Sequence, residues 1–159
     1  MITPLALVCV SLLATFPASP RQENPRTPGN TGTLDRAIES LSEHLDTRPE
    51  NSVAVLWLID ASNSMVDDRA RIRKRLEPEF RKLSERKDVK MAVVAFDKAP
   101  RIVSRFTSQF EDIRKAFDAV GVAGSGVENT LLAVRAGAKL ATAQGTYRAV
   151  ILVTDECGN

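Results

Sequence analysis

Apolar runs alternate with amphipathic segments along the chain after residue 50. Residues 53–59, V-A-V-L-W-L-I, form an uninterrupted apolar run that contains several β-branched side chains. A run of this length between polar residues is typical of a strand buried on both faces of a parallel sheet. Two further runs, at residues 90–96 and 147–154, predict other buried strands. The pattern therefore predicts an α/β fold with a largely parallel sheet.

The segment after the first run predicts a helix that packs on the sheet. Its apolar residues fall close to one helical stripe, with charged residues around them: Met65, Ile72, Leu76, Phe80 and Leu83. Pro78 lies inside this segment. Because a proline removes one backbone hydrogen bond and clashes with the preceding turn, we expect a kink or break near Glu77.

The rest of the chain predicts one more strand and two more helices. Residues 101–106 follow the second strand after a connection short enough for a hairpin, which predicts an antiparallel edge strand. Ser108 and Glu111 have capping-box spacing and predict a helix that ends at Gly121. Residues 128–143, which are rich in Ala and Leu, predict the last helix.

The first fifty residues differ in character from the rest. Residues 1–20 carry no charged side chain, and their apolar run is too short to cross a bilayer comfortably, so they predict a signal for export. We therefore expect an exported protein, secreted, periplasmic or at the cell surface, with no membrane span in the mature chain. Residues 21–32 predict a disordered linker, residues 33–48 an amphipathic helix, and residues 52–159 a globular domain.

Composition narrows the class of protein. A chain of 159 residues with 43% hydrophobic and 26% charged residues suits one soluble domain. The formal net charge is +2, and basic residues are followed closely by acidic ones, which argues against a dedicated nucleic-acid surface. Cys9 would leave with the export signal. Cys157 would then be either an inert thiol or one that reacts or pairs with another.

Three oxygen-bearing side chains follow the first predicted strand at alternate positions: Asp60, Ser62 and Ser64. Open α/β sheets place their binding sites at this end of the strands. One carboxylate and two hydroxyls that converge on a point would suit Mg²⁺ or Mn²⁺. The same residue types also cap the helix that follows a strand. The residues alone leave both interpretations open.

The segment L-I-D-A-S-N-S-M, residues 58–65, resembles the Asp-x-Ser-x-Ser element of von Willebrand factor type A domains, which forms part of their metal-ion-dependent adhesion site. Two further elements follow in the family's order, G-S-G-V-E-N-T-L-L-A-V at residues 124–134 and A-V-I-L-V-T-D-E at residues 149–156. The resemblance covers residues 52–159. It implies a Rossmann-like, doubly wound and mostly parallel sheet with one antiparallel edge strand.

The resemblance also implies a set of metal-site residues. Ser62 and Ser64 would bind Mg²⁺ or Mn²⁺ directly, whereas Asp60 and Asp155 would act mainly through water. One coordination position would remain for an acidic residue of a protein partner. The middle element departs from the family form Gly-x-Thr: alignment places Glu128 at the ligand position, and Thr130 lies two residues later. Either residue could be the ligand.

These observations predict a metal-dependent protein-binding or adhesion module, not an enzyme, with no catalytic residue and no organic cofactor. The alternatives are a metal-dependent hydrolase or phosphotransferase that uses Asp60, and a structural domain without metal. In the family, more strands follow the late aspartate, whereas this sequence stops four residues after Asp155. We therefore expect a domain truncated at its C-terminus, whose strand at residues 149–154 is an exposed apolar edge.

Overall fold

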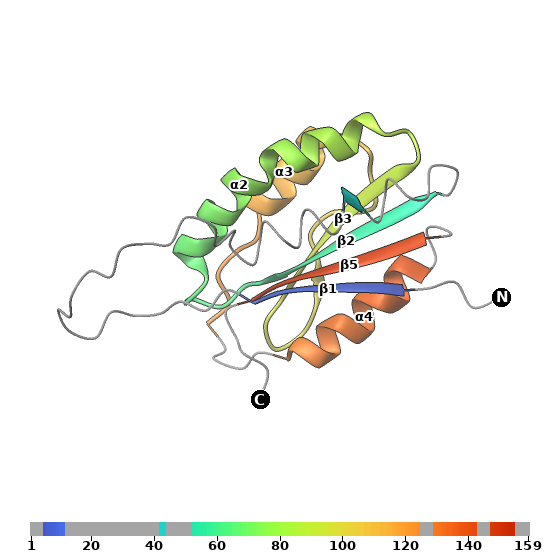
Figure 1. The fold of residues 1–159 in the computed structure, drawn as a ribbon. Helices are drawn as coiled ribbons and strands as arrows, with labels where there is room; N and C mark the ends of the chain where they lie inside the picture. The colour runs from blue at the N-terminus through green and yellow to red at the C-terminus, as the bar shows by residue number, and fades with distance from the viewer. Residues whose placement is uncertain (1–4, 12–41, 44–51, 125–128, 143–146, 155–159) are drawn as a thin grey trace, which may run out of the picture.

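The computed structural model describes residues 5–11, 42–43, 52–124, 129–142 and 147–154. These residues form an α/β fold in which one sheet lies between two layers of helices (Figure 1). The sheet has five strands in the order β1-β5-β2-β3-β4. In chain order the strands are β1 (Leu5–Ser11), β2 (Val53–Asp60), β3 (Val89–Phe96), β4 (Arg101–Ile102) and β5 (Tyr147–Thr154).

The pairing of the strands confirms the predicted class of sheet. β2 is the central strand and pairs in parallel with β3 on one side and with β5 on the other. β4 pairs antiparallel with β3, with Val94 opposite Ile102. The fold is therefore mostly parallel with one antiparallel edge, as predicted. β4 is shorter than the predicted strand at residues 101–106, and the chain beyond it meets β3 again through an isolated bridge between Met91 and Thr107.

Helices cover both faces of the sheet. α2 (Val66–Glu85) and α3 (Phe110–Asp118) lie on one face, and α4 (Thr130–Thr142) lies on the other (Figure 1). Side chains alternate along β2, because successive residues of a strand point to opposite faces. Val55, Trp57 and Ile59 belong to the core beneath α2 and α3. Leu56 and Leu58 belong to the smaller core beneath α4.

Two expectations about the helices were wrong. α2 continues through Pro78 without a break, so the break expected near Glu77 is absent, whereas the alternative, a kink, stays a prediction. Its apolar stripe is buried on the sheet on both sides of the proline, with Leu76 and Phe80 fully buried, and this packing outweighs one lost hydrogen bond. The predicted capping box at Ser108 is also absent: α3 begins at Phe110 with Gln109 as its N-cap, without a side-chain capping bond, and it ends before Gly121.

The predicted exposed edge at residues 149–154 was wrong as well. β1 lies beside β5 and pairs with it in parallel along seven residues, from Leu5 opposite Arg148 to Ser11 opposite Thr154 (Figure 1). An apolar run at the start of the sequence therefore covers the edge that the family resemblance left open. The export signal at residues 1–20 stays a prediction. If β1 pairs with β5 in the folded domain, the segment that contains β1 has not been removed by cleavage.

The other predictions for the first part of the chain fall almost wholly outside the described residues. The linker at residues 21–32 is not described, and of the helix at residues 33–48 only Ser42 and Glu43 are, both in helical conformation. Among the helices that the structure describes, none is long and apolar enough to cross a membrane.

Candidate metal site

Asp60 ends the central strand and is fully buried. Both of its carboxylate oxygens accept hydrogen bonds. The backbone N–H of Ser62 donates to Oδ1 at 2.7 Å, and the hydroxyl of Thr154 donates to Oδ2 at 2.8 Å. The first bond turns the loop after β2, and the second ties this loop to the end of β5. Asp60 is therefore a fixed acidic group at the carboxyl end of the sheet.

Thr154 is a site residue that the sequence did not reveal. Its side chain is 2% exposed and lies against Asp60, although the two residues are 94 positions apart. No local spacing connects them. The signal was indirect: parallel strands bring their carboxyl ends to one edge of a sheet, and the pairing of β2 with β5 makes their last residues neighbours.

The two serine side chains meet in the loop between β2 and α2. Ser62 Oγ and Ser64 Oγ are 2.9 Å apart, and Ser62 is 8% exposed. The N-cap of α2 is Met65, and no side chain caps this helix. Capping of the helix was the alternative explanation for these polar residues, and at α2 it was wrong. Their hydroxyl oxygens remain directed toward each other.

Arg69, in the first turn of α2, holds the same loop from outside. Its Nη1 donates to the carbonyl oxygens of Asp60 at 3.1 Å and of Ser62 at 3.2 Å. Burial lowers the pKa of the Arg69 guanidinium from its usual value, and the negative charge of Asp60 opposes that shift. Sequence reasoning assigned Arg69 no role, because a basic residue on an amphipathic helix is usually a solvated one.

The start of α4 is held at the end of β3, next to the loop. The N–H of Asn129 donates to the carbonyl of Asp97 at 2.8 Å, and the N–H of Ala61 donates to the carbonyl of Phe96 at 2.7 Å. Consecutive carbonyl groups thus bind the two segments that carry the candidate ligands. The side-chain oxygen of Asn129 also accepts a bond from Leu132 N–H at 3.1 Å and so caps α4.

Thr130 follows directly after this cap. Its hydroxyl oxygen is buried and has no hydrogen-bond partner among the residues that the structure describes. A buried hydroxyl is normally paired, because leaving it unpaired costs free energy. A cation bound at this end of the sheet would supply the missing interaction. The hydroxyl oxygens of Ser62, Ser64 and Thr130 and the carboxylate of Asp60 are of the kinds that suit a hard metal ion.

The other two predicted ligands, Glu128 and Asp155, lie outside the described residues, so their assignments stay predictions. Within the described ranges, no three His, Cys, Asp or Glu side chains gather as they do in a metal centre built from those residues. Any ion held by the described residues would depend mainly on neutral hydroxyls. Those residues alone would then compensate only part of its positive charge.

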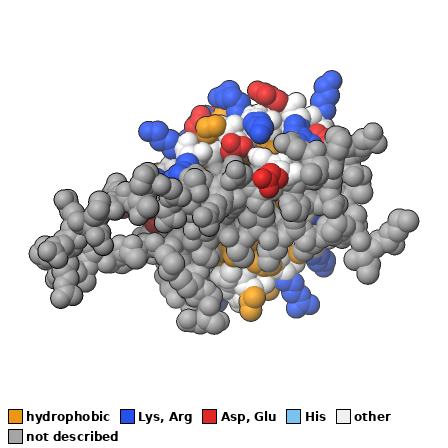
Figure 2. All heavy atoms as spheres, in the orientation of Figure 1, with side chains coloured by type: hydrophobic (Ala, Val, Ile, Leu, Met, Phe, Trp, Pro, Cys, Tyr) orange, Lys and Arg blue, Asp and Glu red, His pale blue; other side chains and the backbone are white. Residues whose placement is uncertain are grey.

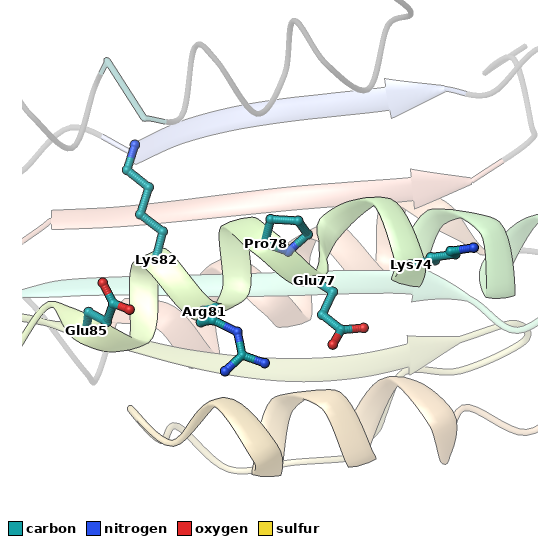
Figure 3. A pocket seen from close by; sticks show the side chains of 6 residues that line it. All are labelled: Lys74, Glu77, Pro78, Arg81, Lys82 and Glu85. Atoms are coloured by element: carbon teal, nitrogen blue, oxygen red, sulfur yellow. The ribbon is translucent and has the colours of Figure 1, made fainter.

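A surface pocket lies away from the end of the sheet, on the outward side of α2. It has a volume of about 410 Å³, and its described lining comes from α2 alone, including Lys74, Glu77 and Arg81 (Figure 3). Acidic and basic side chains are also intermixed over this part of the surface (Figure 2). The pocket on α2 mixes acidic and basic side chains from one helix, and this mixture favours no particular ligand. We therefore take the carboxyl end of the sheet as the candidate site.

Comparison with known proteins agrees with this architecture. The family model described as the von Willebrand factor type A domain matches residues 55–158. No curated protein matches the sequence.

Several solved structures share the fold. The three N-terminal domains of the type V pili tip protein Mfa5 from Porphyromonas gingivalis match with a TM-score of 0.56 and 18% identity, over 64% of this chain and 19% of that one. The PilB minor pilin from Streptococcus sanguinis matches with a TM-score of 0.56 and 18% identity, over 64% of this chain and 29% of that one. This chain thus spans less than a third of either protein, and likeness at this identity concerns the fold alone.

Proposed function

The chain belongs to the von Willebrand factor type A domain family, and from this premise we propose that it is a protein-binding module with a metal-ion-dependent adhesion site. A divalent cation, Mg²⁺ or Mn²⁺, is held at the carboxyl end of the sheet. It bridges the domain to an acidic residue of a protein partner. The module binds and does not catalyse.

The buried, unpartnered hydroxyl of Thr130 is the observation that carries this proposal. It lies at the start of α4, whose first residues are bound to the same end of β3 as the loop with Ser62 and Ser64. Hydroxyl oxygens suit a hard cation, which explains why a protein would keep this one away from other donors. The observation also favours Thr130 over Glu128 as the residue that takes the place of the family's threonine.

The proposed ligands are Ser62, Ser64 and Thr130, with Asp60 acting from behind through water. Asp155 stays in the set because it follows Thr154, whose hydroxyl binds Asp60. When bound, the cation supplies a positive charge at the surface that attracts a carboxylate. Because the ligands proposed to touch it are neutral, much of that charge remains available to a partner.

The geometry of Asp60 argues against the enzyme alternative. A nucleophilic carboxylate needs an oxygen that can reach the substrate, whereas Asp60 is fully buried and each of its oxygens accepts a hydrogen bond. These bonds suit a residue that positions the loop. We therefore assign Asp60 a role in holding the site and none in catalysis.

The place of action follows from two lines of support. A pilus tip protein and a minor pilin share the fold, and residues 1–20 have the composition of an export signal. We propose that the chain acts outside the cytoplasm, at the cell surface or beyond it, where it binds a protein that presents a carboxylate.

Titration with Mn²⁺ tests the metal site. We expect the parent chain to bind Mn²⁺ and to melt at a higher temperature in its presence, because an ion that binds only the native state stabilises it. The double variant Ser62→Ala/Ser64→Ala should lose both effects. Thr130→Ala should bind about tenfold more weakly or worse, by analogy with the loss caused by weakened metal-site residues. Glu128→Gln should stay close to the parent.

Thr142→Ala is the matched control, since Thr142 lies at the far end of the same helix and its hydroxyl bonds to the carbonyl of Ala138 within that helix. It should bind Mn²⁺ as the parent does. A normal titration in the double serine variant would overturn the metal site. Loss of binding in Glu128→Gln together with normal binding in Thr130→Ala would instead make Glu128 the ligand.

A further inference from the structure

A small pocket opens beside the candidate metal site. It has a volume of about 140 Å³ and is lined by three segments: Ala61 in the loop after β2, five residues around the end of β3 (Ala95, Phe96, Asp97, Ala99 and Arg101), and residues 121–123 after α3. Most of the lining is alanine, glycine or another apolar residue, and the charged members are Asp97 and Arg101. Small side chains on all three segments therefore leave an apolar hollow at the end of the sheet.

Backbone hydrogen bonds hold the walls of this pocket together. The N–H of Ala61 donates to the carbonyl of Phe96 at 2.7 Å, and the N–H of Ala123 donates to the carbonyl of Ala61 at 2.8 Å. Ala61 thus links the three segments. It also lies between Asp60 and Ser62 in the sequence, so the pocket wall and the candidate metal loop are one continuous piece of chain. The pocket is formed before any partner arrives.

The size of the pocket limits what can enter it. Pockets for drug-sized ligands usually have volumes of about 300–1,000 Å³. A cavity of about 150 Å³ with an apolar lining holds a group the size of benzene. The pocket beside Ala61 therefore suits a single side chain of a larger molecule, and its alanine walls favour an aliphatic one. Asp97 and Arg101 carry opposite charges, so they give the pocket no net preference for either sign.

We propose that this pocket selects the partner's sequence: the bound segment presents an acidic residue to the cation and, one or two residues away, an aliphatic side chain of valine or leucine size to the pocket. This inference rests on the proposed function, because the cation supplies the charge that fixes the acidic residue. The spacing follows from the chain itself, since neighbouring residues of an extended segment are about 3.3 Å apart and Ala61 adjoins both sites.

Two exposed apolar side chains belong to the segments that form the two sites. Val122, which lines the pocket, is 54% exposed, and Leu131, which follows Thr130 at the start of α4, is 83% exposed. In the sequence, Val122 adjoins other residues that line the pocket, and Leu131 adjoins a proposed metal ligand. A partner segment with one carboxylate and aliphatic neighbours would cover these side chains, whereas a highly charged segment would leave them in contact with polar groups.

A display library of random seven-residue peptides, screened on the full chain in Mn²⁺ and again in EDTA, tests the inference. We expect the peptides retained only in Mn²⁺ to contain an acidic residue with valine, isoleucine or leucine within two positions. Replacing that aliphatic residue by alanine in a selected peptide should weaken binding about tenfold, because the burial of one such side chain is lost.

Ala99→Leu and Lys98→Leu make a matched pair of variants. Both residues are exposed in the same turn, but only Ala99 lines the pocket. Ala99→Leu should fill the pocket and abolish the preference for an aliphatic neighbour while Mn²⁺ affinity stays at the parent value, and Lys98→Leu should change neither. Equal behaviour of the two variants, or Mn²⁺-dependent peptides with acidic residues but no aliphatic neighbour, would overturn the pocket and leave the metal site standing. Absence of any Mn²⁺-dependent peptide would overturn both.

Discussion

The two faces of the sheet are packed very differently. Beneath α2 and α3, aromatic rings fill the core: Trp57 meets Phe80 edge to face with ring centres 4.8 Å apart, and Phe117 lies 4.9 Å from Phe80. Beneath α4, the helix contributes small residues, Ala133, Gly137 and Ala141, which let its backbone approach Leu56 and Leu58 closely. On one face the helices contribute large rings to the core, whereas α4 contributes small buried residues to a core whose large side chains, such as Phe96 and Leu58, come from the strands.

This contrast matters because the candidate metal site has one part on each layer. Ser62 and Ser64 lie in the loop that leads into α2, whereas Thr130 begins α4. A cation that binds all three would join the layer of α2 and α3 to the layer of α4. The affinity for the cation then depends on how rigidly α2 and α4 each hold their ligands. Substitutions in either layer can test the contrast.

The largest effect is expected from the aromatic core. Phe80→Ala removes a fully buried ring from the centre of the cluster and should lower the free energy of unfolding by about 3–5 kcal/mol. Leu140→Ala on the opposite face truncates a side chain that is only partly buried against its core, so it should cost less. Urea denaturation of both variants measures the difference. Equal losses would show that the two faces contribute equally.

A smaller effect is expected where α4 approaches the sheet. A Cβ atom at Gly137 would lie 2.7 Å from Leu56 Cδ2 and 3.0 Å from Leu58 Cδ2. Gly137→Ala should therefore lower stability by about 1 kcal/mol, because crowding of the two buried leucines outweighs the better helix propensity of alanine.

Gly121→Ala is the control for this change, since a Cβ atom there meets none of the described residues within 4 Å. It should leave the melting temperature nearly unchanged. If Gly137→Ala proves as stable as the parent, the leucines move aside easily, and the layer beneath α4 is looser than its close approach suggests.

The smallest effects concern the bonds that tie the site to each layer. Arg69→Met removes the two bonds to the loop carbonyls, and Asn129→Ala removes the cap of α4. Each should cost about 1 kcal/mol. In EDTA the two losses should add to within about 0.5 kcal/mol, because the residues share no bonding partner. In Mn²⁺ they should not add, because the ion couples the layers.

Arg71→Met is the control for Arg69, since Arg71 is 77% exposed and pairs with Asp68 on the same helix. Its effect should stay below about 0.5 kcal/mol, as for other surface ion pairs. Additive losses in both EDTA and Mn²⁺ would mean that no ion links the loop to α4.

The sequence predicted the elements of the domain better than their connections. Residues 53–59 and 147–154 read as buried strands because both faces of a central parallel strand are apolar, and both strands are present. The break at Pro78 was wrong because a helix stripe buried on both sides of a proline holds the helix together. Local patterns predict local structure well, but they do not weigh it against tertiary packing.

The candidate site also has a part that the sequence predicted and a part that it did not. The alternate spacing of Asp60, Ser62 and Ser64 pointed to a polar loop at the end of the sheet, and the structure places the loop there. The bond from Thr154 to Asp60 and the clamp of Arg69 on the loop carbonyls join residues that no motif connects. The unpartnered hydroxyl of Thr130 was equally invisible, because the absence of a partner is a property of the folded molecule.

The pairing of β1 with β5 also bears on how the chain is made. Leu5 lies opposite Arg148, so β1 pairs with a strand that is synthesised much later. Contacts between residues so distant in sequence form slowly, because a long loop must close before they contribute. During synthesis the apolar residues of β1 stay unpaired until β5 has been made. In this interval chaperones or the export machinery can bind them. Whether β1 enters the sheet would then depend on whether β5 binds it before a chaperone or the export machinery does.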